Sequence, residues 1–183
     1  ALTTNVDLFA TIADTYGASI DHRTHGTSLV PLMTGATTSI REWAIGGVYG
    51  NWVQITDGVR KYARSSSGDN FPLSMWSNRW STMPTHVSGY GELPMPDDRA
   101  VLDRMPGSTV PVIRQPFRAG DMLPFWVGRH GTDDHHLYRL DVDPDEQENR
   151  AGDALEREMT DMLRTALAEI DAPLEQLVRL GIA

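Results

Sequence analysis

Four neighbouring residues near the C-terminus have side chains that could bind a metal. Asp133, Asp134, His135 and His136, preceded by His130, offer the carboxylate and imidazole groups that metal ions use as ligands. However, successive residues of an extended segment point to alternate faces, and no His-Glu-x-x-His spacing is present. Aspartates beside a glycine are common in turns, so we interpret this stretch as a solvated polar turn before a strand.

A second group, in the middle of the chain, combines arginine, tryptophan, asparagine and histidine. An arginine can hold an anionic oxygen through two hydrogen bonds, and a tryptophan offers a ring face to a sugar or an aromatic leaving group. We therefore predict that Asn78, Arg79, Trp80 and His86 contact substrate at the rim of an active site. The alternative is that Trp76 and Trp80, four residues apart, anchor one helical turn in a core, which is the commoner place for large aromatic side chains.

Other catalytic patterns are missing from the sequence. The serine-rich run at 65–68 lacks the strand-turn-helix context of a nucleophile elbow and predicts a turn. No phosphate-binding glycine loop occurs, and Gly46-Gly47 lies in strand-like sequence, where it indicates a bulge or close packing.

The composition excludes several classes of protein. Of the 183 residues, 40% are hydrophobic and 22% are charged, which are values typical of a globular chain. A net charge of −9 argues against nucleic acid as a partner and gives little support for binding to an anionic membrane. No apolar run approaches the ~20 residues that span a bilayer. The absence of cysteine excludes disulfides and thiolate metal sites but suits any compartment, so the localisation is left open.

The hydrophobic pattern predicts the elements that must position these side chains. Residues 6–16 and 155–170 have helical periodicity, and Pro173 can begin a short last helix. Residues 43–49, 52–55, 60–64 and 137–142 read as strands, with turns at Gly50-Asn51 and Asp57-Gly58. We predict an α+β fold in which about four strands form an antiparallel sheet and the long C-terminal helix packs on one face.

The segment from 65 to 136 has a different character. Eight of the 11 prolines lie between Pro72 and Pro124, and regular periodicity disappears. Seven large aromatic residues are spread through it, which is unlike a disordered linker. Long ordered loops in compact domains are usually functional or packed on something.

Three stretches resemble, in the right order, the C-terminal part of sulfatases of the alkaline-phosphatase superfamily. In the last of them, residues 137–142 alternate like a half-buried strand until Asp143-Pro144-Asp145 ends the pattern. This run, LYRLDVDPDEQEN at 137–149, is similar to the family's strand-and-turn signature. The earlier stretches are VDLFATIADTYG at 6–17, which has Ala10 where the family commonly has proline, and HGTSLVPLMTG at 25–35. Residues 56–62 resemble the paired strands before the closing signature.

The resemblance implies a complete protein that hydrolyses a sulfuric ester, with formylglycine as nucleophile and a bound calcium or magnesium ion. A sulfatase matures its nucleophile from a Cys/Ser-x-Pro-x-Arg motif, and this chain has neither that motif nor any cysteine. The resemblance therefore implies that nucleophile and metal ligands precede residue 1, and that this chain has no catalytic residue, metal ligand or cofactor. Residues 1–40 would be the end of the main domain. Residues 41–183 would be the C-terminal subdomain, with an insertion at about 65–136.

The expected partner is the N-terminal catalytic domain of the same polypeptide, and the expected ligand is the sulfate-ester substrate. Residues 6–16 form a helix with one apolar face, which would lack its partner in the isolated chain. We therefore expect the isolated chain to form a homodimer. Two alternatives stay open: the C-terminal part of a phosphonate monoester or phosphodiester hydrolase, and a stand-alone binding or oligomerisation module.

Overall fold

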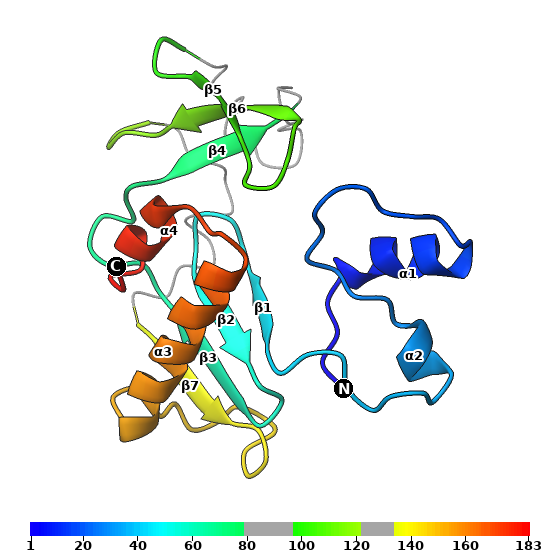
Figure 1. Ribbon diagram of the computed structural model, residues 1–183. Coiled ribbons are helices and arrows are strands. Elements are labelled where there is room, and N and C mark those ends of the chain that lie inside the picture. Colours follow the sequence, from blue (N-terminus) through cyan, green and yellow to red (C-terminus); the bar gives the residue numbers. More distant parts are fainter. Residues whose placement is uncertain (79–96, 122–133) are drawn as a thin grey trace, which may run out of the picture. The chain divides into compact units, whose positions relative to one another are not determined.

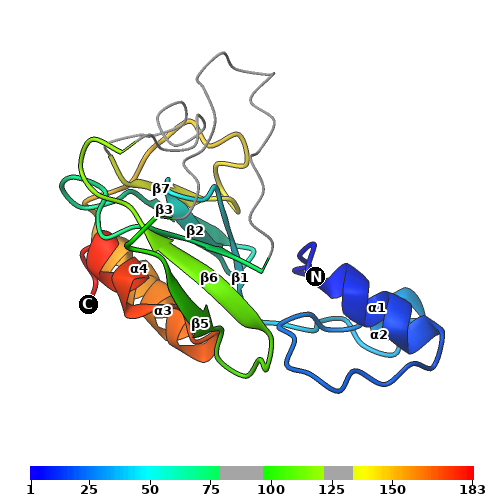
Figure 2. The same ribbon diagram turned by 90° about the horizontal axis from the view of Figure 1, so that it is seen from above.

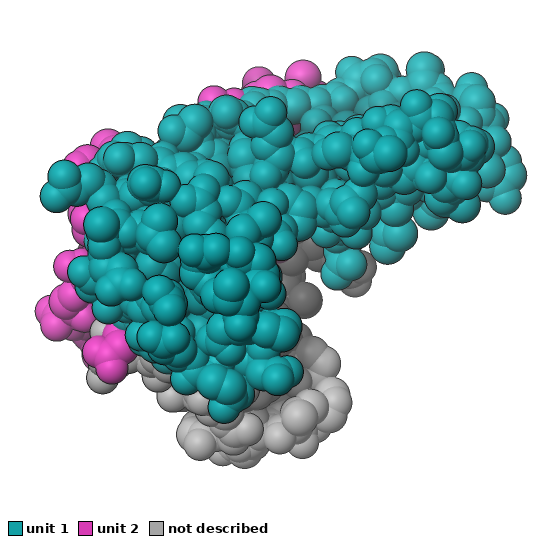
Figure 3. All heavy atoms as spheres, turned by 90° about the horizontal axis from the view of Figure 1, so that it is seen from below, with its two compact units in different colours: residues 1–46, 53–64, 135–170 teal, residues 47–52, 65–134, 171–183 magenta. Residues whose placement is uncertain are grey.

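The computed structural model describes residues 1–78, 97–121 and 134–183. The chain divides into two compact units (Figure 3). Unit 1 comprises residues 1–46, 53–64 and 135–170, and unit 2 comprises residues 47–52, 65–134 and 171–183. Each contains an antiparallel sheet and a helix, so the predicted α+β class is confirmed.

The sheet of unit 1 has four strands in the order β1-β2-β3-β7 (Figure 1). They are β1 (Ala44–Gly47), β2 (Val53–Thr56), β3 (Arg60–Arg64) and β7 (His136–Arg139). β3 lies between β2 and β7 and pairs antiparallel with both, with Tyr62 opposite Ile55 on one side and opposite Leu137 on the other. This is the sheet that the strand patterns predicted.

The long helix α3 (Ala154–Glu169) packs on β2 and β3, as its apolar stripe predicted (Figure 2). Helix and sheet bury apolar side chains that have at most 3% of their surface exposed: Ile55, Tyr62, Leu137, Met159, Leu163, Ala166 and Leu167. No helix in the described part of the chain combines the length and apolar character that a membrane crossing needs.

The turn between β2 and β3 shows why a short polar sequence fixes the register of the hairpin. The Asp57 carboxylate accepts hydrogen bonds from the backbone N–H groups of Val59, at 2.9 Å, and Arg60, at 2.6 Å. Gly58 adopts a φ of 88°, a left-handed conformation that favours glycine. The predicted turn at Asp57-Gly58 is therefore confirmed.

Unit 2 contains a second sheet, which the sequence patterns did not predict. Its strands are β4 (Ser74–Ser77), β5 (Val101–Arg104) and β6 (Pro111–Pro116), in the order β4-β6-β5. Prolines stand at the first and last positions of β6, where a missing N–H disturbs the ladder least. The short helix α4 (Leu174–Arg179) belongs to the same unit and was predicted at about this position.

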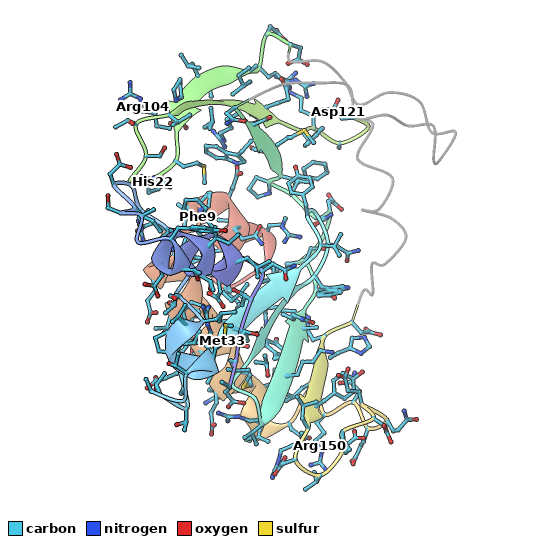
Figure 4. The ribbon with its side chains drawn as sticks, turned by 90° about the vertical axis from the view of Figure 1, so that its right-hand side faces the viewer. Phe9, His22, Met33, Arg104, Asp121 and Arg150 are labelled. Atoms are coloured by element: carbon cyan, nitrogen blue, oxygen red, sulfur yellow. The ribbon has the colours of Figure 1, made fainter. Side chains whose placement is uncertain are left out.

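Helix α1 (Asp7–Thr15) has its large apolar side chains on the exposed side. Its buried residues are Asp7, Ala10 and Ala13, which are small or charged. Five large apolar residues in and beside the helix are instead between 52% and 83% exposed: Val6, Leu8, Phe9, Ile12 and Tyr16. Met33, the last residue of α2 (Val30–Met33), is also 77% exposed (Figure 4).

A polar network joins β3 to the start of α3 within unit 1. The buried Tyr62 donates its hydroxyl proton to Glu156 at 2.8 Å and accepts a hydrogen bond from Arg64 at 2.8 Å. The second oxygen of Glu156 accepts from the Gly152 N–H at 2.6 Å. Burial raises the pKa of the Glu156 carboxyl, but the Gly152 and Tyr62 hydrogen bonds and the positive charges of His135 and Arg64 together lower it below its ordinary value of 4.5.

This lowered pKa predicts a pH-dependent contribution to stability. The Glu156 carboxylate stabilises the folded state above its unfolded pKa, and this contribution is lost as pH falls below the ordinary value of 4.5 and through the lower folded pKa. We expect Glu156→Gln to lower the urea midpoint at pH 7 and to reduce its decrease on acidification. Urea melts of both proteins across this range provide the check. Urea midpoints that fall equally with pH in the wild type and in Glu156→Gln would contradict this role of Glu156.

Candidate functional site

The predicted site residues fall mainly outside the described part of the chain. Arg79, Trp80 and His86 lie in the stretch 79–96, which the structure does not describe. Asn78 is exposed and directly follows β4. The described residues nearest in sequence to the predicted rim are therefore those of β4, and they form a polar cluster with neighbouring elements of unit 2.

Trp76 and Arg114 are the centre of this cluster. They are register partners on β4 and β6, and directly opposite residues of an antiparallel pair have their side chains on the same face. The Arg114 guanidinium carbon lies 5.4 Å from the centroid of the Trp76 ring, within the range of a cation–π contact. The alternative interpretation of Trp76 as part of a helical turn is wrong, because Trp76 lies in a strand.

Glu175, in the first turn of α4, holds these two side chains in place. Its carboxylate accepts hydrogen bonds from Arg114 Nη2 at 2.7 Å, from Ser74 Oγ at 2.8 Å and from Trp76 Nε1 at 3.2 Å. The Glu175 side chain is 13% exposed and that of Arg114 is 33% exposed. With three donors around it, the carboxylate is an anchor for Arg114 and Trp76 and is poorly suited to act as a general base.

The electrostatic environment of the cluster extends to Tyr49 and Arg179 of the same unit. Burial, assisted by the negative charge of Glu175, raises the pKa of the Tyr49 phenol well above its ordinary value, although 37% of the residue is exposed and Arg179 acts in the opposite direction. Tyr49 therefore stays protonated at neutral pH. Arg179 is 1% exposed, and its Nη1 donates to the Asn51 carbonyl at 2.9 Å and to Asn70 Oδ1 at 2.7 Å.

The chemistry that this cluster can perform is binding. It presents an aromatic ring and a partly exposed guanidinium that the half-buried Glu175 carboxylate keeps in one orientation. Such a pair can contact a hydroxyl-bearing or anionic group, because the guanidinium is a planar hydrogen-bond donor. The Ser74 hydroxyl does contact the Glu175 carboxylate, but Ser74 is only 3% exposed and that carboxylate also accepts from Arg114 and Trp76, so the pair is poorly placed to attack a substrate.

Among the described residues, those that could bind a metal do not form a metal centre. Nowhere in the described ranges do three or more His, Asp or Glu side chains come close enough to hold a metal ion. The Asp134 backbone carbonyl accepts a hydrogen bond from Ser65 Oγ at 2.6 Å, and the His135 ring makes an edge contact with Tyr62. His136 Nδ1 lies 2.8 Å from the Tyr138 hydroxyl. His130 and Asp133 lie outside the described residues, and the residues described here do not fit the divalent cation that the sulfatase resemblance implies.

Sequence reasoning missed Arg114, Glu175 and Ser74. Trp76 and Glu175 are 99 positions apart in the chain, so no local spacing could connect them. Recognising that β4 pairs with β6 would have brought Ser74 and Arg114 together. The sequence does not reveal this pairing, because neither strand has a clear period-two pattern.

No family model matches the chain, and no curated protein matches it. One matching solved structure comes from Bacteroides thetaiotaomicron and is named as a sulfatase from work on glycosaminoglycan metabolism. It is 16% identical with a TM-score of 0.47, and the match covers 87% of this chain but 24% of that one. The present chain thus spans about a quarter of that structure, and a match of this size is too weak to assign a family.

Proposed function

We propose that this chain is the C-terminal part of a sulfatase-like hydrolase. The complete protein would cleave a sulfuric ester with a formylglycine nucleophile and a divalent cation, both supplied by its N-terminal catalytic domain. Residues 1–40 would belong to that main domain, and residues 41–183 would form the subdomain, with 65–136 as an insertion. The chain itself would be non-catalytic, acting as scaffold and as one wall of the substrate pocket.

The observation that carries this proposal is the structure of residues 137–149, the stretch with the strongest sequence resemblance. Its polar residues form the connection that follows the last strand of the sheet. Asn149 Oδ1 accepts from the backbone N–H of Leu137 at 2.9 Å, and Asn149 Nδ2 donates to the His135 carbonyl at 3.0 Å. The Asp143 carboxylate accepts from the N–H groups of Gln147 and Glu148 at 3.0 and 2.9 Å.

An ion pair ties the same connection to the middle of the sheet. Nζ of Lys61, the sole lysine of the sequence, lies 2.8 Å from both carboxylate oxygens of Glu146. Lys61 belongs to β3 and is the register partner of Tyr138 on β7. Asp143, Glu146 and Asn149 thus each have a structural task, which supports the proposal that 137–149 closes a sulfatase-type subdomain.

In this proposal, the polar cluster of unit 2 forms the pocket wall. Trp76 lies in β4, the strand that leads to Asn78, and Arg114 is its register partner on β6. We propose that Asn78, Arg79, Trp80 and His86 contact the substrate. In the complete protein, Arg79→Ala and His86→Ala should each raise KM for the sulfate ester. Unchanged steady-state kinetics in both variants would remove these residues from the pocket.

The rival functions differ in the chemistry upstream of this chain. Peptide mass mapping of the complete polypeptide should find a formylglycine at a Cys/Ser-x-Pro-x-Arg motif. Paired assays with sulfate esters and with phosphonate monoesters or phosphodiesters should then give the higher kcat/KM for sulfate. A preference for the phosphorus esters would favour the related hydrolases, and a native polypeptide without any such nucleophile would favour a stand-alone module.

The exposed side of α1 predicts how the isolated chain behaves. Phe9, Ile12 and Tyr16 are 52%, 59% and 83% exposed and lie on the same side of the helix. We propose that the catalytic domain covers this side in the complete protein. In its absence, contiguous apolar surface favours self-association. We expect the 183-residue chain to form a homodimer at high micromolar concentration in sedimentation velocity.

A double variant localises this contact. Phe9→Ser with Ile12→Gln should shift the chain to the monomer, whereas Val142→Ser, which changes an apolar residue of unit 1 that is 65% exposed, should leave the dimer intact. A strictly monomeric wild-type chain would contradict the prediction, and so would a dimer that the double variant does not weaken.

A further inference from the structure

A cavity in unit 1 has the composition of a small ligand site and is independent of the proposed function. Its volume is about 360 Å³, and it is lined by residues from three segments: His25 and Thr27, the run Arg41-Glu42-Trp43 before β1, and Glu169-Ile170 at the end of α3. This volume lies at the lower end of the range for small-molecule sites, about 300–1,000 Å³.

The positive charge in the cavity wall is already neutralised. Arg41 pairs with Asp7, whose carboxylate is fully buried and also accepts from the Thr4 N–H at 2.7 Å and the Thr27 N–H at 3.0 Å. The Arg41 Nε atom is buried and therefore offers no donor to a ligand in the cavity. The guanidinium of Arg41 is thus a fixed part of the wall.

The negative charges in the wall are not neutralised in the same way. Glu42 and Glu169 are exposed, and neither carboxylate has a hydrogen-bond or ion-pair partner among the residues that the structure describes. The α3 helix also ends here, and its last turn contains no basic residue. Arg23 Nη2 donates to the Glu169 carbonyl at 3.1 Å and so offsets part of the helix-end charge. The charge balance of the lining stays negative.

Trp43 adds an aromatic surface to this negative cavity. A tryptophan ring attracts cations through its quadrupole, and its apolar area favours a ligand with a hydrocarbon part. A bare divalent cation is a poorer fit, because His25, Glu42 and Glu169 do not form a group that could hold a metal. We propose that the cavity binds a small organic cation, an alkylammonium or alkylguanidinium, with the charge near Glu42 and Glu169 and the alkyl part on Trp43.

The proposal is tested by NMR titration of the 183-residue chain with n-butylammonium and, separately, with n-butanol, which has the same alkyl chain without the charge. The indole N–H signal of Trp43, assigned with Trp43→Phe, should shift saturably with n-butylammonium and not with n-butanol. Glu42→Gln and Glu169→Gln should each weaken binding by about three- to tenfold, because each removes one of the two unpaired carboxylates.

Glu158→Gln is the matched control, since Glu158 lies on the same helix but outside this cavity and pairs with Arg60 at 2.8 Å. Its affinity for n-butylammonium should equal that of the wild type. Three results would overturn the proposal: no saturable shift at Trp43, an equal response to n-butanol, or unchanged affinity in both glutamate variants of the cavity.

Discussion

Leu163→Ala is expected to lower the free energy of unfolding of unit 1 by about 2–5 kcal/mol, the range for a buried leucine whose removal leaves a cavity. Leu163 is fully buried and lies in α3, the helix that packs on β2 and β3. The packing of Leu163 supports the sheet of unit 1, to which β7 contributes the last strand. Urea unfolding followed by circular dichroism measures the change.

Leu174→Ala makes the same chemical change at a residue that is 70% exposed. It should alter stability by no more than about 0.5 kcal/mol. Equal effects at the two positions would mean that α3 does not bury Leu163 as described.

Arg179→Met is expected to destabilise unit 2 by about 1–3 kcal/mol, because it leaves acceptors inside the unit without their donor. The side chain donates to the Asn51 carbonyl at 2.9 Å, to Asn70 Oδ1 at 2.7 Å and to Gln176 Oε1 at 3.1 Å. Methionine fills a similar volume but donates no hydrogen bond. Hydrogen exchange of the β6 amides reports the loss of stability within this unit.

Arg164→Met is the matched control, since the Arg164 side chain is 47% exposed and pairs with Asp161 on the surface of α3. Exposed pairs contribute about 0–1 kcal/mol. If both arginine variants changed exchange in β6 to the same small extent, the buried role of Arg179 would be wrong.

The fold of unit 1 was predictable because its patterns are local. Residues 60–64 and the start of 137–142 correspond to β3 and β7, and the apolar stripe of 155–170 corresponds to α3. Period-two and period-3.6 spacing reflect which side of an element is buried. They can therefore be recognised in the sequence without knowing what the element packs against. The turn at Asp57-Gly58 is equally local, since an aspartate side chain accepts from the backbone that follows it.

The second sheet was not predictable, because its strands lack a local hydrophobic pattern. All four residues of β5 are exposed, so burial imposes no alternation on its sequence. β4 has one buried residue, Ser74, which no hydrophobic pattern would select. Both strands are recognisable once β6 pairs with them, and the β4–β6 pairing joins residues that are far apart in the chain, such as Trp76 and Arg114.

The candidate site likewise depends on contacts between residues that are far apart in the chain. Asn78 was identified from its neighbours in sequence, but the described cluster depends on Trp76, Arg114 and Glu175, which come from two strands and a helix. The sequence predicted tryptophan–arginine chemistry at Arg79 and Trp80, which lie outside the described residues, whereas the described pair is Trp76 and Arg114. The sequence could not identify which arginine contacts which tryptophan.

We propose above all that this chain supports a sulfatase-type reaction without performing it. The most direct measurement compares the hydrolysis of 4-methylumbelliferyl sulfate by the complete polypeptide and by the purified 183-residue chain, at equal concentration and with added calcium or magnesium. The account predicts turnover by the complete polypeptide and none above the buffer rate by the chain alone. Sulfate-ester turnover by the isolated chain, or none by the complete polypeptide, would contradict it.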